Sequence, residues 1–250
     1  VGYGQWTDVV SRSVPGQSLY NFYGYVVDGV YKDFQDILNS PVDTRQQNNP
    51  IVTDADGKKH WSTDPTKYSR TNTVFVGDLK FKDINGDGVI DENDRTNIGS
   101  PMPKWTFGWN NTFRWKQWDL NIFINGSVGN KVGNYVKMKL THMNSPWTNQ
   151  LTDVSKRAIL APADGNYSGN WYDNIANVIV SNPSATLPRA TINDPNDNDA
   201  WSDRYVESAS YLRLKSITLG YTFKPELIHK IGLTNLRLTL NATTLFTITG

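Results

Sequence analysis

Residues 105–128 constrain the fold of this chain more than any other segment. The stretch W-T-F-G-W-N-N-T-F-R-W (105–115) alternates with period two, and so does W-D-L-N-I-F-I-N-G-S-V (118–128), with Phe123 as the exception. The first stretch places five aromatic residues on one strand face, interrupted only by Asn111: Trp105, Phe107, Trp109, Phe113 and Trp115. Because only Lys116 and Gln117 separate the two stretches, they predict a tight antiparallel hairpin.

The positions of the tryptophans favour a membrane hairpin. Trp115 and Trp118 flank the turn, whereas Trp105 and Trp109 mark the far end of the first strand. Ten steps of about 3.3 Å, tilted by roughly 40°, rise about 25 Å, the height of the apolar band of an outer-membrane barrel with its two aromatic girdles. A soluble β-sandwich with tryptophan in its core is the alternative.

The rest of the chain divides into short and long connections. Residues 217–223 and 235–242 alternate again, and the segment from Pro225 to Gly232 between them predicts one short helical turn. Residues 129–208 form a long polar connection with one short helix expected at 151–160, and residues 1–104 contain turn residues and local β segments such as 20–27 and 74–82. Short turns on one side and long loops on the other are typical of outer-membrane barrels.

Composition excludes several classes of protein. The chain has 25 basic and 24 acidic residues, so no electrostatic footprint indicates nucleic-acid binding. It has no cysteine, which removes disulfide frameworks and thiolate sites. No apolar run reaches about 18 residues, which excludes a transmembrane helix. The first eight residues have neither a basic start nor an apolar core, so no signal peptide is expected.

The segment D-I-N-G-D-G-V-I-D-E-N-D (83–94) has the spacing of a calcium loop. Oxygen ligands at positions 1, 3, 5, 7, 9 and 12 wrap a hard cation, and Gly88 at position 6 turns the chain. The expected ligands are the side chains of Asp83, Asn85, Asp87, Asp91 and Asp94 and the carbonyl of Val89. Asp94 is one methylene shorter than the usual glutamate, so a modest affinity is expected. The alternative is a plain Asn-Gly and Asp-Gly turn without metal.

Three blocks of the sequence resemble the C-terminal part of SusC/RagA-type TonB-linked outer-membrane transporters of the Bacteroidetes. They are F-Y-G-Y-V-V-D-G-V-Y (22–31), residues 77–109 from G-D-L-K-F-K to W-T-F-G-W, and S-D-R-Y-V-E-S-A-S-Y-L-R-L-K-S-I-T-L-G-Y-T-F (202–223). The resemblance implies an importer of oligosaccharides or peptides in the Gram-negative outer membrane. It also implies energy from TonB and a SusD-like surface lipoprotein as a lid. The plug, the TonB-contacting segment and the final aromatic strand are expected outside this chain.

The expected fold is therefore all-β, an antiparallel transmembrane segment of a 22-stranded barrel with long extracellular loops. Residues 1–104 are expected to form an extracellular loop region that contains the calcium-type loop, and 105–128 a transmembrane hairpin. A long extracellular loop is expected at 129–208, and further barrel strands at 209–250 with a periplasmic turn at 224–234.

Candidate substrate contacts are aromatic, because flat rings stack on sugars or pack against peptide side chains. Those in the long loop are Trp147, Trp171, Tyr172 and Trp201, with packing inside the loop as the alternative role. Polar residues expected on the lumen face are Arg114, Asp119, Asn121 and Arg237.

An enzyme is not expected, because no motif fixes a catalytic carboxylate pair or a nucleophile. His60, His142 and His229 lack metal-ligand spacing. The competing function is that of a soluble calcium-dependent carbohydrate-binding β module.

Overall fold

The computed structural model describes residues 10–144 and 147–250; the opening residues considered for a signal peptide lie outside these ranges. The chain divides into two compact units. One comprises residues 1–99 and 133–206, and the other comprises residues 100–132 and 207–250. Among the described residues, no helix is long and apolar enough to cross a membrane.

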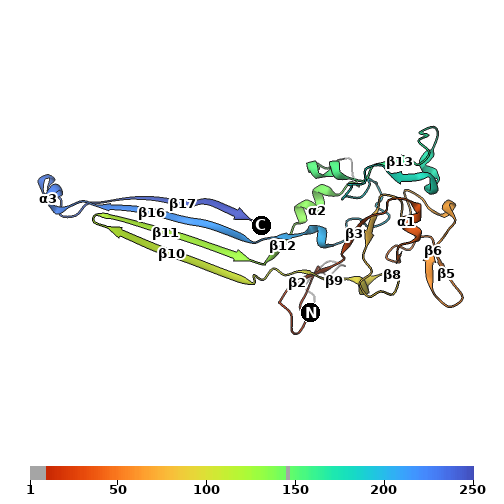
Figure 1. The fold of residues 1–250 in the computed structure, drawn as a ribbon, viewed down its shortest axis with the longest axis horizontal. Coiled ribbons are helices and arrows are strands. Elements are labelled where there is room, and N and C mark those ends of the chain that lie inside the picture. Colours follow the sequence, from red (N-terminus) through yellow and green to blue (C-terminus); the bar gives the residue numbers. More distant parts are fainter. Residues whose placement is uncertain (1–9, 145–146) are drawn as a thin grey trace. The chain divides into compact units, whose positions relative to one another are not determined.

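The second unit is one antiparallel sheet of four long strands in the order β10-β11-β16-β17 (Figure 1). Its strands are β10 (Trp105–Trp115), β11 (Trp118–Val128), β16 (Tyr211–Thr222) and β17 (Arg237–Thr249). The hairpin β10-β11 has the predicted bounds, and Trp115 pairs with Trp118 across the turn. Lys116 in that turn has a φ of 54°, the left-handed conformation that such short hairpin loops require.

The second connection lies at the same end of the sheet as the hairpin turn (Figure 1). It contains α3 (Pro225–Ile228) and η7 (His229–Ile231), so the helical turn predicted there is confirmed. Pro225 occupies the first turn of α3, where its missing N–H is not needed. Gly232 ends the turn in the left-handed region with a φ of 76°.

Strands β16 and β17 are longer than the alternating segments at 217–223 and 235–242. A bulge explains the difference, because the register shifts between Leu214 and Ser216. The extra residue, Lys215, lets Leu214 and Ile217 point to the same face although they are three residues apart. The period-two pattern therefore breaks where the strand continues.

The first unit consists of short elements around small cores. Its sheets are β1-β2-β9 and four pairs, β3-β7, β4-β8, β5-β6 and β13-β14. The strands are β1 (Ser11–Arg12), β2 (Asn21–Gly24), β3 (Val27–Val30), β4 (Val42–Asp43), β5 (Ile51–Thr53), β6 (Lys59–Trp61), β7 (Leu79–Phe81), β8 (Val89–Ile90), β9 (Thr96–Gly99), β13 (Leu160–Pro162) and β14 (Val178–Val180). The helices are α1 (Phe34–Leu38), α2 (Tyr135–Thr141), η1 (Pro65–Lys67), η2 (Glu92–Asp94), η3 (Thr152–Lys156), η4 (Trp171–Asp173), η5 (Ile175–Asn177) and η6 (Asp203–Tyr205). Strands β12 (Lys131–Gly133) and β15 (Val206–Ser208) contain two of the chain crossings between the units.

Two local predictions for the first unit were only partly correct. The strand expected over 74–82 is limited to β7, because Gly77 adopts a φ of 87° and the carboxylate of Asp78 accepts the backbone N–H of Phe75 at 2.9 Å. The helix expected at 151–160 is only η3, and the chain then enters β13. The helix that does form is α2, which Asn134 caps by accepting the N–H of Lys137 at 2.8 Å.

A buried polar network ties distant segments of the first unit together. Asp78 is fully buried, and its carboxylate lies 2.8 Å from Nε of Arg189, which is also buried. The side-chain amide of Asn198 donates to the same carboxylate at 3.2 Å. Asn198 also accepts the backbone N–H of Leu79 at 2.7 Å. The long polar segment before β15 is thereby held against β7 by hydrogen bonds that replace a larger apolar core.

Candidate functional sites

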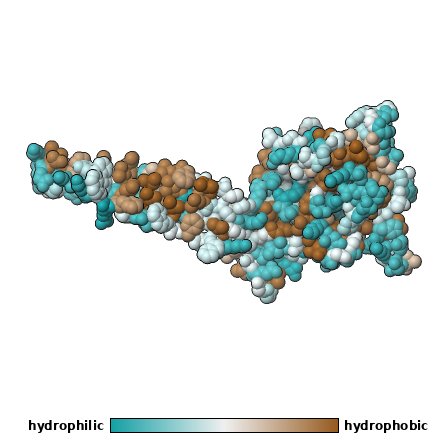
Figure 2. Space-filling model, viewed as in Figure 1, coloured by the Kyte–Doolittle hydropathy of each residue, from teal (hydrophilic) through white to brown (hydrophobic). Residues whose placement is uncertain are grey.

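One face of the four-stranded sheet is apolar on every strand. The register aligns the apolar residues of neighbouring strands, as in the row Phe113, Leu120, Leu219 and Leu240. Many of these side chains are exposed: 75 % for Trp105, 67 % for Trp115 and 69 % for Leu240. Figure 2 shows apolar side chains gathered over these strands, with hydrophilic ones at the end that carries α3. Among the described residues of this unit, no second sheet covers this face.

Aromatic rings gather on this face at the turn end. Trp118 pairs with Tyr221 on the neighbouring strand, and their ring centroids are 4.6 Å apart. Phe223 makes an edge contact with Tyr221 at 4.8 Å. Together with Trp115, these rings form one aromatic border of the apolar face, and Trp105 lies at the opposite end of β10. This is the arrangement of a membrane-barrel wall with aromatic girdles.

The opposite face of the sheet is polar and hydrogen-bonded between strands. All four residues expected on a lumen face, Arg114, Asp119, Asn121 and Arg237, alternate with the apolar set and so lie on this side. The amide of Asn121 donates to Asn110 and to Thr112, both at 2.8 Å. Asp119 pairs with Arg237 at 2.7 Å although β16 lies between their strands.

Gly220 makes this long-range ion pair possible. It lies opposite Asp119 on β16, and a Cβ at this position would meet the Asp119 carboxylate at 2.6 Å and the Arg237 guanidinium at 2.7 Å. Phe123, the exception to the alternation of β11, has a comparable explanation. Its ring lies over Gly108 of β10, 3.4 Å from where a Cβ would be, so it covers a position that lacks a side chain.

The calcium-type loop folds as a series of tight turns. Asp83 accepts the backbone N–H groups of Gly86 at 2.6 Å and Gly88 at 2.7 Å, and Asp87 accepts that of Val89 at 2.9 Å. Gly88 has a φ of 82°, as a turn at position 6 requires. The next two residues form β8, which pairs with β4 and buries Ile90. The loop is therefore anchored to a β scaffold and not to two helices.

The all-oxygen donor set of this loop suits a hard cation, but the carboxylates do not converge. Asp94 is fully buried, and its two oxygens accept the N–H groups of Ile84 and Asp91, both at 2.8 Å. Asp91 in turn caps η2 by accepting from Asn93 at 2.7 Å. Within residues 10–144 and 147–250, no three Asp or Glu side chains of the loop bring ligand oxygens within 4.8 Å of one another. Cation binding through Asp91 and Asp94 requires these two side chains to turn.

The aromatic substrate candidates occupy different environments. Trp201 is 4 % exposed, stacks on Tyr135 at 5.0 Å and packs tightly against Gly24 and Gly133. These contacts favour the packing role for Trp201. Trp171 and Tyr172 are partly exposed and touch each other at 5.6 Å, and Trp147 is 91 % exposed. Their surfaces remain accessible to a ligand.

Sequence reasoning missed a group of side chains that could hold a metal ion. His142, which has no ligand spacing in the sequence, lies beside Asp194 and Asp199 in the structure. No local signal identifies this group, because a long stretch of chain separates the histidine from both aspartates.

The chain is similar to known bacterial TonB-dependent receptors. It is 29 % identical to "TonB-dependent receptor P3" of Formosa agariphila over 234 residues, which cover 94 % of this chain and 18 % of that protein. It is also 29 % identical to "TonB-dependent receptor P39" of the same organism, over 91 % of this chain and 21 % of the relative. The chain thus spans about a fifth of the length of these curated relatives. No family model matches it.

Two solved structures share the fold. One is the RagAB peptide transporter, with a TM-score of 0.52 and 17 % identity, covering 92 % of this chain and 19 % of that chain. The other is the RagAB peptide importer in its 'closed-closed' state, with a TM-score of 0.51 and 17 % identity, covering 96 % and 21 %.

Proposed function

We propose that this chain is a segment of a SusC/RagA-type TonB-dependent transporter, and that it supplies part of the wall and the extracellular loops of an outer-membrane nutrient importer; its similarity to TonB-dependent receptors and to the RagAB fold supports this. In this proposal β10, β11, β16 and β17 are neighbouring strands of the barrel. The turns at Lys116–Gln117 and around α3 face the periplasm. Residues 1–104 and 129–208 lie on the extracellular side.

The single observation that carries this proposal is the exposed apolar face opposite a polar, hydrogen-bonded face. In a soluble sandwich the rings of Trp105 and Trp115 would be sealed against a second sheet. In a membrane barrel the same rings meet lipid, and the side of Asp119 and Arg237 meets an aqueous lumen. The strands of 11 to 13 residues are also long enough for tilted membrane strands.

The two edges of the sheet support a larger barrel. Strands β10 and β17 each pair on one side only among the described residues. Exposed backbone N–H and C=O groups at such edges cannot persist in lipid, so both strands need further partners. We propose that these partners belong to a barrel of 22 strands, the size typical of plugged outer-membrane transporters.

The proposed partners are a SusD-like surface lipoprotein and TonB, and the proposed substrates are oligosaccharides or peptides. Trp147, Trp171 and Tyr172 present aromatic surfaces that suit either substrate class or the lipoprotein. One solved structure that shares the fold is that of the RagAB peptide transporter. The competing function, a soluble calcium-dependent carbohydrate-binding module, does not account for the exposed apolar face.

We further propose that the loop at 83–94 binds calcium and thereby rigidifies the extracellular connection before β10. Asp83, Asn85, Asp87 and the carbonyl of Val89 form the first part of the site, and Asp91 and Asp94 close it after they turn. Calorimetric titration of the full-length protein with calcium tests this. Asp87→Ala should abolish the heat, whereas Asp56→Ala, in the exposed Asp-Gly turn before Gly57, should leave it unchanged. No heat at millimolar calcium would end the calcium proposal.

Site-directed spin labelling tests the membrane assignment. This chain contains no cysteine, so Leu240→Cys and Thr239→Cys place single labels on opposite faces of β17 within it. In bilayers oxygen, which dissolves in lipid, should accelerate the spin relaxation of the label at 240, and a water-soluble nickel chelate should accelerate that of the label at 239. Equal accessibility to the chelate at both positions would refute a lipid-facing sheet. Uptake of labelled oligosaccharides and peptides by cells with and without the protein then tests import.

A further inference from the structure

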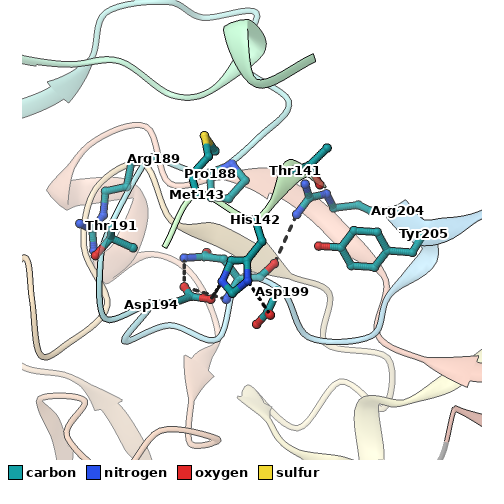
Figure 3. Close-up of a pocket in the computed structure, with 11 residues that line it drawn as sticks. Thr141, His142, Met143, Pro188, Arg189, Thr191, Asp194, Asp199, Arg204 and Tyr205 are labelled. Carbon is teal, nitrogen blue, oxygen red and sulfur yellow. Dashed lines mark hydrogen bonds and ion pairs between the residues drawn. The ribbon is translucent and has the colours of Figure 1, made fainter. Parts of the chain in front are cut away.

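His142 stands between two carboxylates at the end of α2 (Figure 3). Its Nδ1 lies 3.1 Å from Oδ2 of Asp199, and its Nε2 lies 3.5 Å from Oδ2 of Asp194. Both aspartates belong to the polar segment that precedes η6. Among the His, Asp and Glu side chains in the described ranges, this is the group of three whose ligand atoms all lie within 4.8 Å of one another.

Two buried polar atoms in this group face each other without a hydrogen bond. The side chain of Asp194 is 9 % exposed, and its Oδ1 is already engaged by the backbone and side-chain N–H groups of Asn198 at 3.0 and 2.6 Å. Its Oδ2 and Nε2 of His142 are both buried and have no hydrogen-bond partner. Their separation of 3.5 Å exceeds the usual N–H···O range of about 2.7–3.2 Å. Unsatisfied buried polar atoms are rare in native proteins and call for an explanation.

We propose that Nε2 of His142 and Oδ2 of Asp194 are ligands of a late first-row divalent cation of the zinc class. Zinc binds histidine nitrogen and carboxylate oxygen at about 2.0–2.2 Å. With such bonds, a separation of 3.5 Å between the ligand atoms corresponds to an angle of about 115° at the metal, close to the tetrahedral value. The two atoms therefore already stand at the spacing that a shared zinc ion requires.

Asp199 completes the arrangement as a positioning residue. By accepting a hydrogen bond from Nδ1–H at 3.1 Å, it holds the imidazole in the tautomer that leaves the lone pair of Nε2 directed at Asp194. Metal-ligating histidines commonly donate their second N–H to a carboxylate in this way, and loss of that partner costs about 10- to 100-fold in metal affinity. The side chains of His142 and Asp194 supply two ligand atoms, so a cation bound here would take its remaining ligands from water.

A proton competes with the metal for Nε2. The neighbouring carboxylate of Asp194 raises the pKa of His142, with a further contribution from the charge of Asp199, while burial and the charge of Lys139 oppose this rise. Metal binding should therefore be measured at pH 8, where the imidazole is more readily deprotonated. The bound metal would join the end of α2 to the segment of Asp194 and Asp199 in one unit of the chain.

Zinc titration calorimetry and cobalt absorption on the full-length protein test this proposal. Cobalt should give the intense visible bands of tetrahedral coordination. His142→Gln and Asp194→Asn should each lower zinc affinity at least about tenfold and remove these bands, and Asp199→Asn should lower it about 10- to 100-fold. The matched control is His60→Gln, because His60 also pairs with an aspartate, Asp54, at 2.8 Å but is exposed.

Each outcome bears on the site itself. Unchanged zinc affinity in His142→Gln, or loss of binding in His60→Gln, would overturn the assignment. The absence of zinc binding to the parent protein at 100-fold molar excess would also overturn the assignment. In that case a proton shared between His142 and Asp194 would account for the two facing atoms. Circular dichroism of each variant separates loss of a ligand from loss of the fold. A second readout is the thermal midpoint, which zinc should raise in the parent protein and not in His142→Gln.

Discussion

The apolar face of β17 allows a direct energetic test through two neighbouring residues. Ala242 pairs with Ile217 on the apolar face, and Thr243 pairs with Ser216 on the polar face. We expect Ala242→Arg to destabilise the protein strongly in a bilayer and Thr243→Arg to have little effect. Arginine replaces a small side chain in both cases, so the comparison isolates the environment that the new charge enters.

The magnitude follows from the depth of Ala242 in the sheet. Five residue steps separate it from Arg237 at the turn end of β17. At about 3.3 Å per step and a tilt of roughly 40°, these steps correspond to about 13 Å, close to the middle of an apolar band about 25 Å high. Arginine on the lipid face at the midplane costs about 2–4 kcal/mol. The unfolding equilibrium should therefore change by about 30- to 900-fold.

Reversible urea unfolding of the full-length protein in lipid vesicles, followed by tryptophan fluorescence, measures these differences. Leu238→Arg supplies a depth control, because residue 238 lies one step from the end of the strand, where the charge penalty itself falls to about 0–1 kcal/mol. The reasoning is refuted if Ala242→Arg and Thr243→Arg cost the same, or if the charge penalty does not grow from 238 to 242. Equal slopes of unfolding free energy against urea are needed for the comparison to hold.

Three further predictions test other contacts. Gly220→Ala should lower the free energy of unfolding by about 0.5–1 kcal/mol less in an Asp119→Ala background than in the parent protein, because the added Cβ then meets no ion pair. A double-mutant cycle that shows no coupling between the two positions would contradict this. Arg189→Met should lower the free energy of unfolding in urea by about 3–5 kcal/mol, because it leaves the buried carboxylate of Asp78 without its ion-pair partner. A loss below about 1 kcal/mol would contradict this prediction. Trp201→Ala should lower the free energy of unfolding by about 3–5 kcal/mol, because it removes a buried core side chain, and Trp171→Ala, at a partly exposed position, should lower it less. The reverse order would refute the packing role of Trp201.

Regular alternation made the hairpin predictable from sequence. In β10 and β11 each side chain lies on the apolar or the polar face according to its parity, so the pattern and the two-residue turn together define the register. The same logic failed in β16 and β17, where the extra Lys215 changes the parity within one strand. A bulge is stabilised by its partner strands, and the two-residue alternation of apolar and polar residues does not reveal its position.

The sequence by itself determined that this chain is an all-β protein with one strongly apolar sheet face, short turns at one end and a loop rich in hard oxygen ligands. Those features depend on neighbours within a few residues, which fix strand parity and turn geometry. Only the tertiary structure decided that Trp201 is buried, that Asp119 reaches Arg237 over Gly220, and that His142 meets Asp194 and Asp199. These contacts join segments far apart in the chain, and the folding of the whole unit, not the local pattern, brings them together.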